Sequence, residues 1–124
     1  FQACVSRTGY ADWSHYYRHG SLPTVNLLGH SLGSVESNRK VYEASAAINA
    51  VEGMQTPLLV IDEEADPEVP PLDLRTDLVA KLRGLAKPVR YKKYKSTGGP
   101  YANHPAGANE LLPDMMEYFS EYLG

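Results

Sequence analysis

The clearest hydrophobic pattern in this chain is a run of four apolar residues at 58–61, in the stretch TPLLVID. An apolar run without alternation is typical of a strand that is covered on both faces of a parallel sheet. Two other stretches, FQACVSR at 1–7 and VRYKKY at 89–94, also favour strands. TVNLL at 24–28 is a candidate short strand that ends at a glycine. The pattern therefore predicts a sheet of three to four strands.

Three further stretches place apolar residues at helical spacing. They are Val41, Ala44, Ile48 and Val51 within residues 36–51, then Leu74, Leu78, Leu82 and Leu85, and finally Leu111, Leu112, Met115, Phe119 and Tyr122. Each set lies on one face of a helix, so we predict three amphipathic helices. Pro113 is expected in the first turn of the last helix, where proline is tolerated. Residues 10–23 favour an irregular loop or a short helix, and residues 95–109 a long loop.

The order of these elements determines the predicted fold class. Strands that alternate with helices indicate an α/β architecture, here a three-layer domain in which helices flank a small, mostly parallel sheet. At 124 residues, the chain has the length of a single domain spanning 1–124. Ligands of such sheets gather at the carboxyl ends of the strands. We therefore look for function in the segments that follow the predicted strands.

Composition and charge exclude two classes of partner. The net charge is −3 and there is no dense basic stripe, so we expect no nucleic-acid partner. The basic residues Arg90, Lys92, Lys93 and Lys95 alternate with apolar ones, as on the outer face of a strand. No apolar run approaches the ~20 residues of a membrane span, and no basic-then-apolar leader is present. We therefore expect no membrane partner and a cytoplasmic location.

Two features at the start of the chain carry separate expectations. Cys4 is the single cysteine, which excludes an internal disulfide, and its apolar setting predicts a core residue rather than a reactive thiol. The first residue is Phe1 and not methionine, which suggests a processed product or an excised piece.

The pentapeptide GHSLG at 29–33 has the GxSxG pattern of a nucleophile elbow. An elbow is a tight strand-to-helix turn that lifts a serine hydroxyl toward a base, and the flanking TVNLL and SVESNRKVYEASAAI would supply the strand and the helix. Asp66 and His104 follow Ser31 in the chain order that α/β-hydrolases use. Two interpretations stay open: Ser31 is a nucleophile, or it belongs to an ordinary turn between strands.

Three stretches resemble a known family. FQACVSRTGYADW, TPLLVIDEEADPEVPPLDLRTDLVAKLRGLAKPVRYKKY and the terminal helix are similar to the carboxyl half of the catalytic α/β-hydrolase domain of the prolyl oligopeptidase family of serine peptidases and esterases. The resemblance implies that Asp66, in EADPEVP, is the triad acid. It also places the family's basic histidine at Gly99, and the family's own elbow before the strand that residues 1–7 resemble, upstream of Phe1.

These observations lead to one functional hypothesis. We expect a hydrolase of ester, amide or peptide bonds in which Ser31 is the nucleophile, Asp66 the orienting acid and His104 the base. His104 lies five residues beyond the position where the family has its histidine. No organic cofactor and no resident metal are implied.

Two alternatives belong to other function classes. Carboxylates crowd one predicted strand end and four histidines are available, which would suit a metal-dependent hydrolase. The residues concerned are Asp62, Glu63, Glu64, Asp66 and Glu68 with His15, His19, His30 and His104. The second alternative is a catalytically inactive half-domain that self-associates through the exposed sheet edge beside residues 1–7, as a homodimer.

Overall fold

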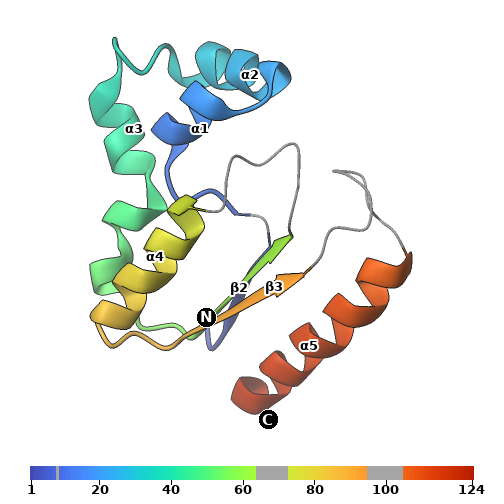
Figure 1. Cartoon of the computed structure of the whole chain (residues 1–124). Coiled ribbons are helices and arrows are strands. Elements are labelled where there is room, and N and C mark those ends of the chain that lie inside the picture. The colour runs from blue at the N-terminus through green and yellow to red at the C-terminus, as the bar shows by residue number, and fades with distance from the viewer. Residues whose placement is uncertain (8, 64–72, 95–104) are drawn as a thin grey trace.

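The computed structural model of the chain describes residues 1–7, 9–63, 73–94 and 105–124 (Figure 1). Three strands alternate with helices along the chain. The elements are β1 (Cys4–Arg7), α1 (Trp13–His19), α2 (Leu22–Leu32), α3 (Arg39–Ser45), the 3-10 turns η1 (Ala47–Asn49) and η2 (Val51–Gly53), β2 (Leu58–Glu63), α4 (Asp73–Gly84), β3 (Val89–Tyr94) and α5 (Pro105–Leu123). The strands β1, β2 and β3 confirm the strands predicted near 1–7, 56–62 and 89–94.

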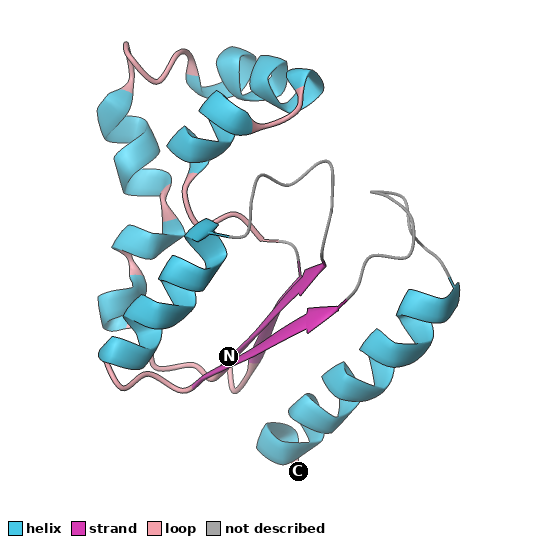
Figure 2. Ribbon diagram, viewed as in Figure 1, coloured by secondary structure: helices cyan, strands magenta, loops and turns pink. Residues whose placement is uncertain are grey.

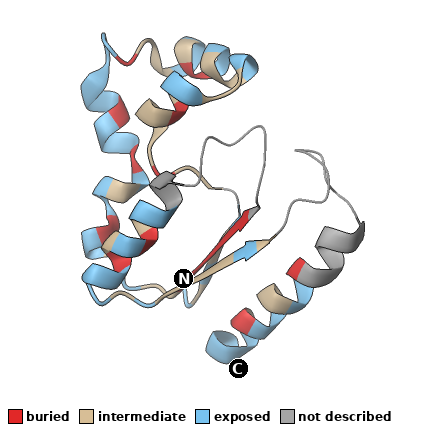
Figure 3. Ribbon diagram, in the orientation of Figure 1, coloured by how far each residue is buried: buried red, intermediate tan, exposed pale blue. Residues whose placement is uncertain are grey.

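The three strands form one parallel sheet in the order β1-β2-β3. The central strand β2 is buried from Leu58 to Asp62, as expected for a strand covered on both faces (Figure 3). Backbone hydrogen bonds start both pairings, from Cys4 N–H to the Pro57 carbonyl and from Leu58 N–H to the Pro88 carbonyl, each at 2.9 Å. The predicted α/β architecture with a small parallel sheet is confirmed.

Helices cover the two faces of the sheet with separate apolar clusters (Figure 2). On one face, Leu58 and Val60 of β2 pack with Val51, Val79 and Leu82, which come from η2 and α4. On the other face, Leu59 and Ile61 pack with Leu111 and Tyr118 of α5. Because side chains alternate along a strand, the unbroken apolar run of β2 supplies both clusters.

The basic residues of β3 lie differently from the prediction. Arg90 and Lys92 contact α5, which covers their face of the sheet, instead of forming a solvated outer face. The Arg90 guanidinium donates two hydrogen bonds to the Glu121 carboxylate, at 3.1 and 2.8 Å. Lys92 Nζ lies 2.6 Å from Asp114 Oδ1, and the Tyr94 hydroxyl donates to Asp114 Oδ2. These polar contacts hold α5 at one position along the length of β3.

The contacts of Asp114 with Lys92 and Tyr94 predict how the stability of the fold depends on acid pH. Hydrogen bonds from Lys92 and then Tyr94 lower the pKa of Asp114, so its carboxylate stabilises the fold above the unfolded-state pKa and loses that contribution as the pH falls through the lowered value. We expect the Tm to drop more steeply below about pH 4 in the parent than in Asp114→Asn. Circular dichroism melts between pH 5 and pH 2 measure this. Glu117→Gln, which removes an exposed acid from the same helix, should keep the parental slope, and equal slopes for all three proteins would contradict the assignment.

Four local expectations are wrong. Residues 24–28 lie in helix α2 and not in a strand, and the helix predicted within 36–51 is the shorter α3 followed by two 3-10 turns. Pro113 lies inside α5, which begins at Pro105, and not in its first turn. Cys4 is exposed at the edge strand instead of lying in the core.

The sequence predicts no membrane-spanning segment, and the helices of the structure can be compared with that expectation. Within residues 1–7, 9–63, 73–94 and 105–124, no helix has both the length and the apolar character required to cross a bilayer.

Candidate functional site

The carboxyl ends of the strands define the edge at which ligands of such sheets bind. β1, β2 and β3 are parallel and end at Arg7, Glu63 and Tyr94, and Glu63 and Tyr94 are register partners. Helices α1 and α2 stand on the side toward which the strands point (Figure 1). The segments that leave β2 and β3 therefore start side by side at this edge.

A carboxylate lies within the sheet at this edge. Asp62 of β2 is fully buried, and the alternation from Leu58 and Val60 places it on the face that α4 covers. Its register partner on β3 is Lys93. The sequence placed Asp62 at the end of this strand, in the acidic cluster offered as a source of metal ligands, but did not predict its complete burial.

The other predicted site residues at this edge lie outside the described part of the chain. Asp66, Glu64 and Glu68 fall within residues 64–72, and His104 and Gly99 fall within residues 95–104. Asp66 follows Glu63, the last residue of β2, by three positions, and His104 immediately precedes Pro105, the first residue of α5. Their chain positions thus connect them to the elements around this edge.

Ser31 has a local structure unlike that of a nucleophile elbow. It is the penultimate residue of α2 and is exposed, so the predicted strand-turn-helix around it is wrong. Gly29 lies within the helix, while Gly33 ends it with φ 75° and donates its N–H to the Gly29 carbonyl at 3.1 Å. A Cβ on Gly33 would lie 2.3 Å from Asn38 Nδ2. This glycine of GxSxG therefore serves a helix terminus.

An aromatic cluster that sequence reasoning missed joins β1 to α1 and α2. The ring of Tyr10 lies 4.1 Å from that of Tyr16 and 4.9 Å from that of Trp13. Tyr10 donates from its hydroxyl to the Tyr16 hydroxyl at 3.1 Å, and Tyr16 donates to Thr24 Oγ1 at 3.3 Å. The density of aromatic residues at 10–17 was the available signal. The cluster holds both helices against the segment that follows β1.

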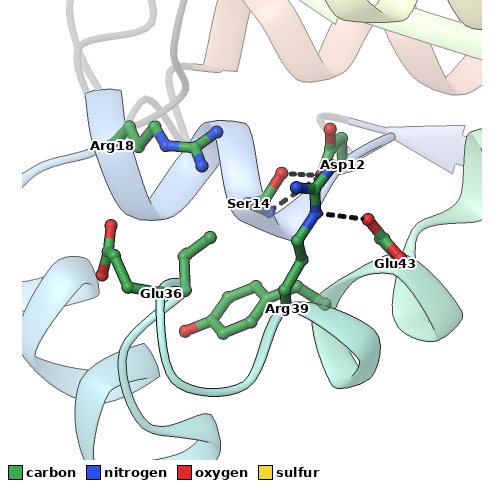
Figure 4. Close-up of a pocket in the computed structure, with 8 residues that line it drawn as sticks. Asp12, Ser14, Arg18, Glu36, Arg39 and Glu43 are labelled. Atoms are coloured by element: carbon green, nitrogen blue, oxygen red, sulfur yellow. Dashed lines mark hydrogen bonds and ion pairs between the residues drawn. The ribbon is translucent and has the colours of Figure 1, made fainter.

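A polar cavity of about 510 Å³ lies between α1 and α3 (Figure 4). Arg18 and Glu36 stand at one end, while Arg39 lies at the other end beside Asp12 and Glu43. The lining residues are Asp12, Ser14, Arg18, Val35, Glu36, Arg39, Tyr42 and Glu43. Both signs of charge are present, so the cavity offers hydrogen-bond donors and acceptors to a polar ligand.

The serine and the aspartate of this cavity form a helix cap and not a catalytic pair. Asp12 Oδ1 accepts hydrogen bonds from the Ser14 backbone N–H at 2.8 Å and from Ser14 Oγ at 2.7 Å, which is the arrangement of an N-cap. None of the described residues that line the cavity is a histidine that could act as a base. Arg39 donates from Nε to Glu43 Oε1 at 2.7 Å on the surface of α3. The described lining residues therefore do not form a Ser-His-Asp arrangement.

Tyr42 lines the cavity and stays neutral. It is fully buried and donates from its hydroxyl to the Gly33 carbonyl at 2.8 Å. Burial, followed by the neighbouring Tyr17 and Glu36, raises the pKa of Tyr42. The phenol therefore acts as a hydrogen-bond donor that fixes the end of α2 to α3.

The hypothesis of a metal-dependent hydrolase finds no metal-binding cluster among the described residues. Across residues 1–7, 9–63, 73–94 and 105–124, no group of three or more histidine, cysteine, aspartate or glutamate side chains is arranged to hold a metal ion. His19 and His30 are exposed on α1 and α2 respectively. His104 and the carboxylates of Glu64, Asp66 and Glu68 lie outside these ranges.

Comparison with known proteins decides the family. The sequence profile of the prolyl oligopeptidase family matches residues 1–124. The chain belongs to the prolyl oligopeptidase family. This confirms the resemblance inferred from the residues. The comparison with curated proteins gives no match.

Solved structures of similar fold are peptidases of much greater length. An acylaminoacyl peptidase of Pyrococcus horikoshii has a TM-score of 0.85 at 20% identity, with 98% of this chain and 20% of that chain covered. Porphyromonas gingivalis dipeptidyl peptidase 4 has a TM-score of 0.74 at 18% identity, with 98% of this chain and 16% of that chain covered. A puromycin-hydrolyzing peptidase of Mycobacterium tuberculosis has a TM-score of 0.71 at 20% identity, with 77% of this chain and 14% of that chain covered. This prolyl oligopeptidase-family chain thus spans about a fifth or less of these proteins, and shares the fold of that part.

Proposed function

We propose that this chain forms part of a serine hydrolase that cleaves amide or ester bonds in peptides or small molecules, with Asp66 as the triad acid. The proposal is carried by the strand that leads to Asp66. β2 is the central strand among the described strands of a prolyl oligopeptidase-family sheet and is covered on both faces, and Asp66 follows its last residue by three positions. The family's acid occupies the turn after this strand, within the pattern that EADPEVP matches.

His104 is the proposed base. Its segment leaves β3 at Tyr94, the register partner of the β2 residue from which the Asp66 segment leaves. An acid and a base on segments from two paired strands can meet above the same edge of the sheet. In that arrangement the carboxylate would orient the imidazole, and the imidazole would take the proton of the nucleophile. The departure from the family is that Gly99 stands at the position of its histidine.

For the nucleophile, we propose a serine outside these 124 residues. The resemblance places the family's elbow before the strand that corresponds to β1. The helical and exposed position of Ser31 removes the backbone geometry that would present its hydroxyl as an elbow does.

A fluorophosphonate probe tests this function. The full-length protein that contains this chain is expected to be labelled covalently on a single serine outside residues 1–124, identified by mass spectrometry of the tryptic peptides. Ser31→Ala is expected to keep the label and the esterase activity. If the label mapped to Ser31 and were lost in Ser31→Ala, Ser31 of α2 would be the nucleophile. A folded, full-length protein that takes no label and hydrolyses neither esters nor peptides would contradict the hydrolase proposal.

The alternatives from other function classes stay predictions. Self-association is supported by the edge position of β1, which pairs with β2 among the described strands. An apolar cavity of about 350 Å³ beside this edge, lined among others by Ser6, Val60 and Leu78, would also be covered by a partner. A metal-dependent hydrolase would have to draw its ligands from the acidic residues after β2 together with His104.

A further inference from the structure

Two histidines lie one turn apart on α1 and are not used by the proposed hydrolase. His15 and His19 have ring centroids 4.4 Å apart, with an angle of 40° between the ring planes. Residues four apart share one face of a helix. His15 is half-buried and His19 is exposed, so the pair opens to solvent at the carboxyl-terminal turn of the helix.

The helix that carries the pair is held at its start, its middle and its end. The Asp12 side chain caps its first turn, and the Gly20 N–H donates to the Tyr16 carbonyl at 2.7 Å at its last turn. Tyr16, which lies between the two histidines in sequence, is buried and hydrogen-bonded to Tyr10 and to Thr24. Both imidazoles therefore project from a backbone that is already ordered, which lowers the entropy cost of bringing them together on a ligand.

We propose that His15 and His19 form a chelating site for a divalent transition-metal ion of the Zn²⁺, Ni²⁺ or Cu²⁺ class. Imidazole nitrogens suit these ions, and two histidines at i and i+4 on a helix are a recurrent pair of metal ligands. A metal needs one nitrogen from each ring, so the other nitrogen can keep a hydrogen-bond partner. Mg²⁺ and Ca²⁺ prefer oxygen ligands and should not bind.

The number of protein ligands sets the expected strength. Among the described residues no third histidine, cysteine, aspartate or glutamate completes a cluster with this pair. Water then occupies the remaining coordination positions, and the affinity should be well below that of a four-ligand structural zinc site, with a Kd on the order of 10 µM. The metal would therefore bind reversibly and bridge one turn of α1, at a site distinct from a metal-dependent catalytic centre.

The experiment is a Ni²⁺ titration of the tag-free protein in a Cys4→Ser background, which removes the exposed thiol as a competing ligand. Trp13, the single tryptophan of the chain, starts the same helix and reports binding through fluorescence quenching, while calorimetry measures the stoichiometry. We expect one ion per chain. His19→Gln should weaken binding at least about tenfold, because it removes one of two ligands. His30→Gln, an exposed histidine on α2, should leave the affinity unchanged.

Two results would overturn the proposal. One is the absence of saturable Ni²⁺ and Zn²⁺ binding at millimolar metal in a folded protein. The other is an affinity of His19→Gln equal to that of the parent. Because His19 is exposed, this variant should keep the fold, which far-UV circular dichroism checks. The readout is binding alone, so it is independent of whether the protein proves to be a hydrolase.

Discussion

Replacing Asp66 by Asn in the full-length protein is expected to lower kcat for ester and peptide hydrolysis by roughly 10³–10⁴-fold. In a triad, the carboxylate accepts a hydrogen bond from one imidazole nitrogen, keeps the other nitrogen available as the base, and stabilises the imidazolium that forms. An asparagine side chain has the same shape but no charge, and its amide can favour the wrong tautomer. The KM should change little, because the acid does not contact the substrate. Steady-state kinetics with an activated ester and a peptide measure both parameters.

Glu68→Gln is the matched control, since it removes a carboxylate two residues away in the same acidic segment. It should retain kcat within a few-fold of the parent. The rate of fluorophosphonate labelling should follow kcat in both variants, because the same activated nucleophile takes part in both reactions. An Asp66→Asn enzyme with parental kcat, or an equal loss in Glu68→Gln, would show that Asp66 is not the triad acid.

Replacing Leu82 by Ala is expected to lower the free energy of unfolding by about 2–5 kcal/mol. Leu82 lies on α4, is fully buried, and belongs to the cluster with Val60 and Val79 that covers one face of β2. Removing its side chain loses the transfer free energy of the buried atoms and leaves a cavity under the central strand. Domains are stable by only about 5–15 kcal/mol, so this is a large share of the total. Urea denaturation followed by circular dichroism measures the change.

Leu85→Ala provides a control of the same chemistry near the same helix. Leu85 is the residue after the end of α4 and is 41% exposed, so its replacement should cost less than about 1 kcal/mol. The sequence pattern assigns both leucines to one apolar stripe and does not distinguish them. Equal destabilisation by the two substitutions would contradict the packing of α4 described above.

The candidate site stays in part a prediction. The buried apolar run specified the strand that ends at this edge, and the resemblance of EADPEVP to the family's pattern implies an acid after that strand. The pairing of Glu63 with Tyr94, the strand residues from which the segments of Asp66 and His104 leave, is a register between strands about thirty residues apart. Register depends on which apolar faces are buried together, and a linear pattern does not contain that information.

The strand predicted before the GxSxG motif shows how a short pattern can mislead. Residues 24–28 contain few enough apolar positions to fit a strand or a helix. Packing decided between them: Thr24 accepts a hydrogen bond from the buried Tyr16 of α1, and its Oγ1 lies 3.1 Å from Ser21 Oγ. Residues three apart share a face in a helix but not in a strand. Ser31 then lies near the end of α2, where the same glycines serve a helix and its terminus.

What the sequence by itself determined is the set of elements with strong local signals. A four-residue apolar run specifies a strand buried on both faces, and leucines at helical spacing specify α4, because the side-chain period follows from backbone geometry alone. Only the tertiary structure decided the helix at Leu22–Leu32 and the pairing of Arg90 and Lys92 with α5. These depend on contacts between segments whose own preferences are weak, so the free energy of packing, and not local propensity, selects them.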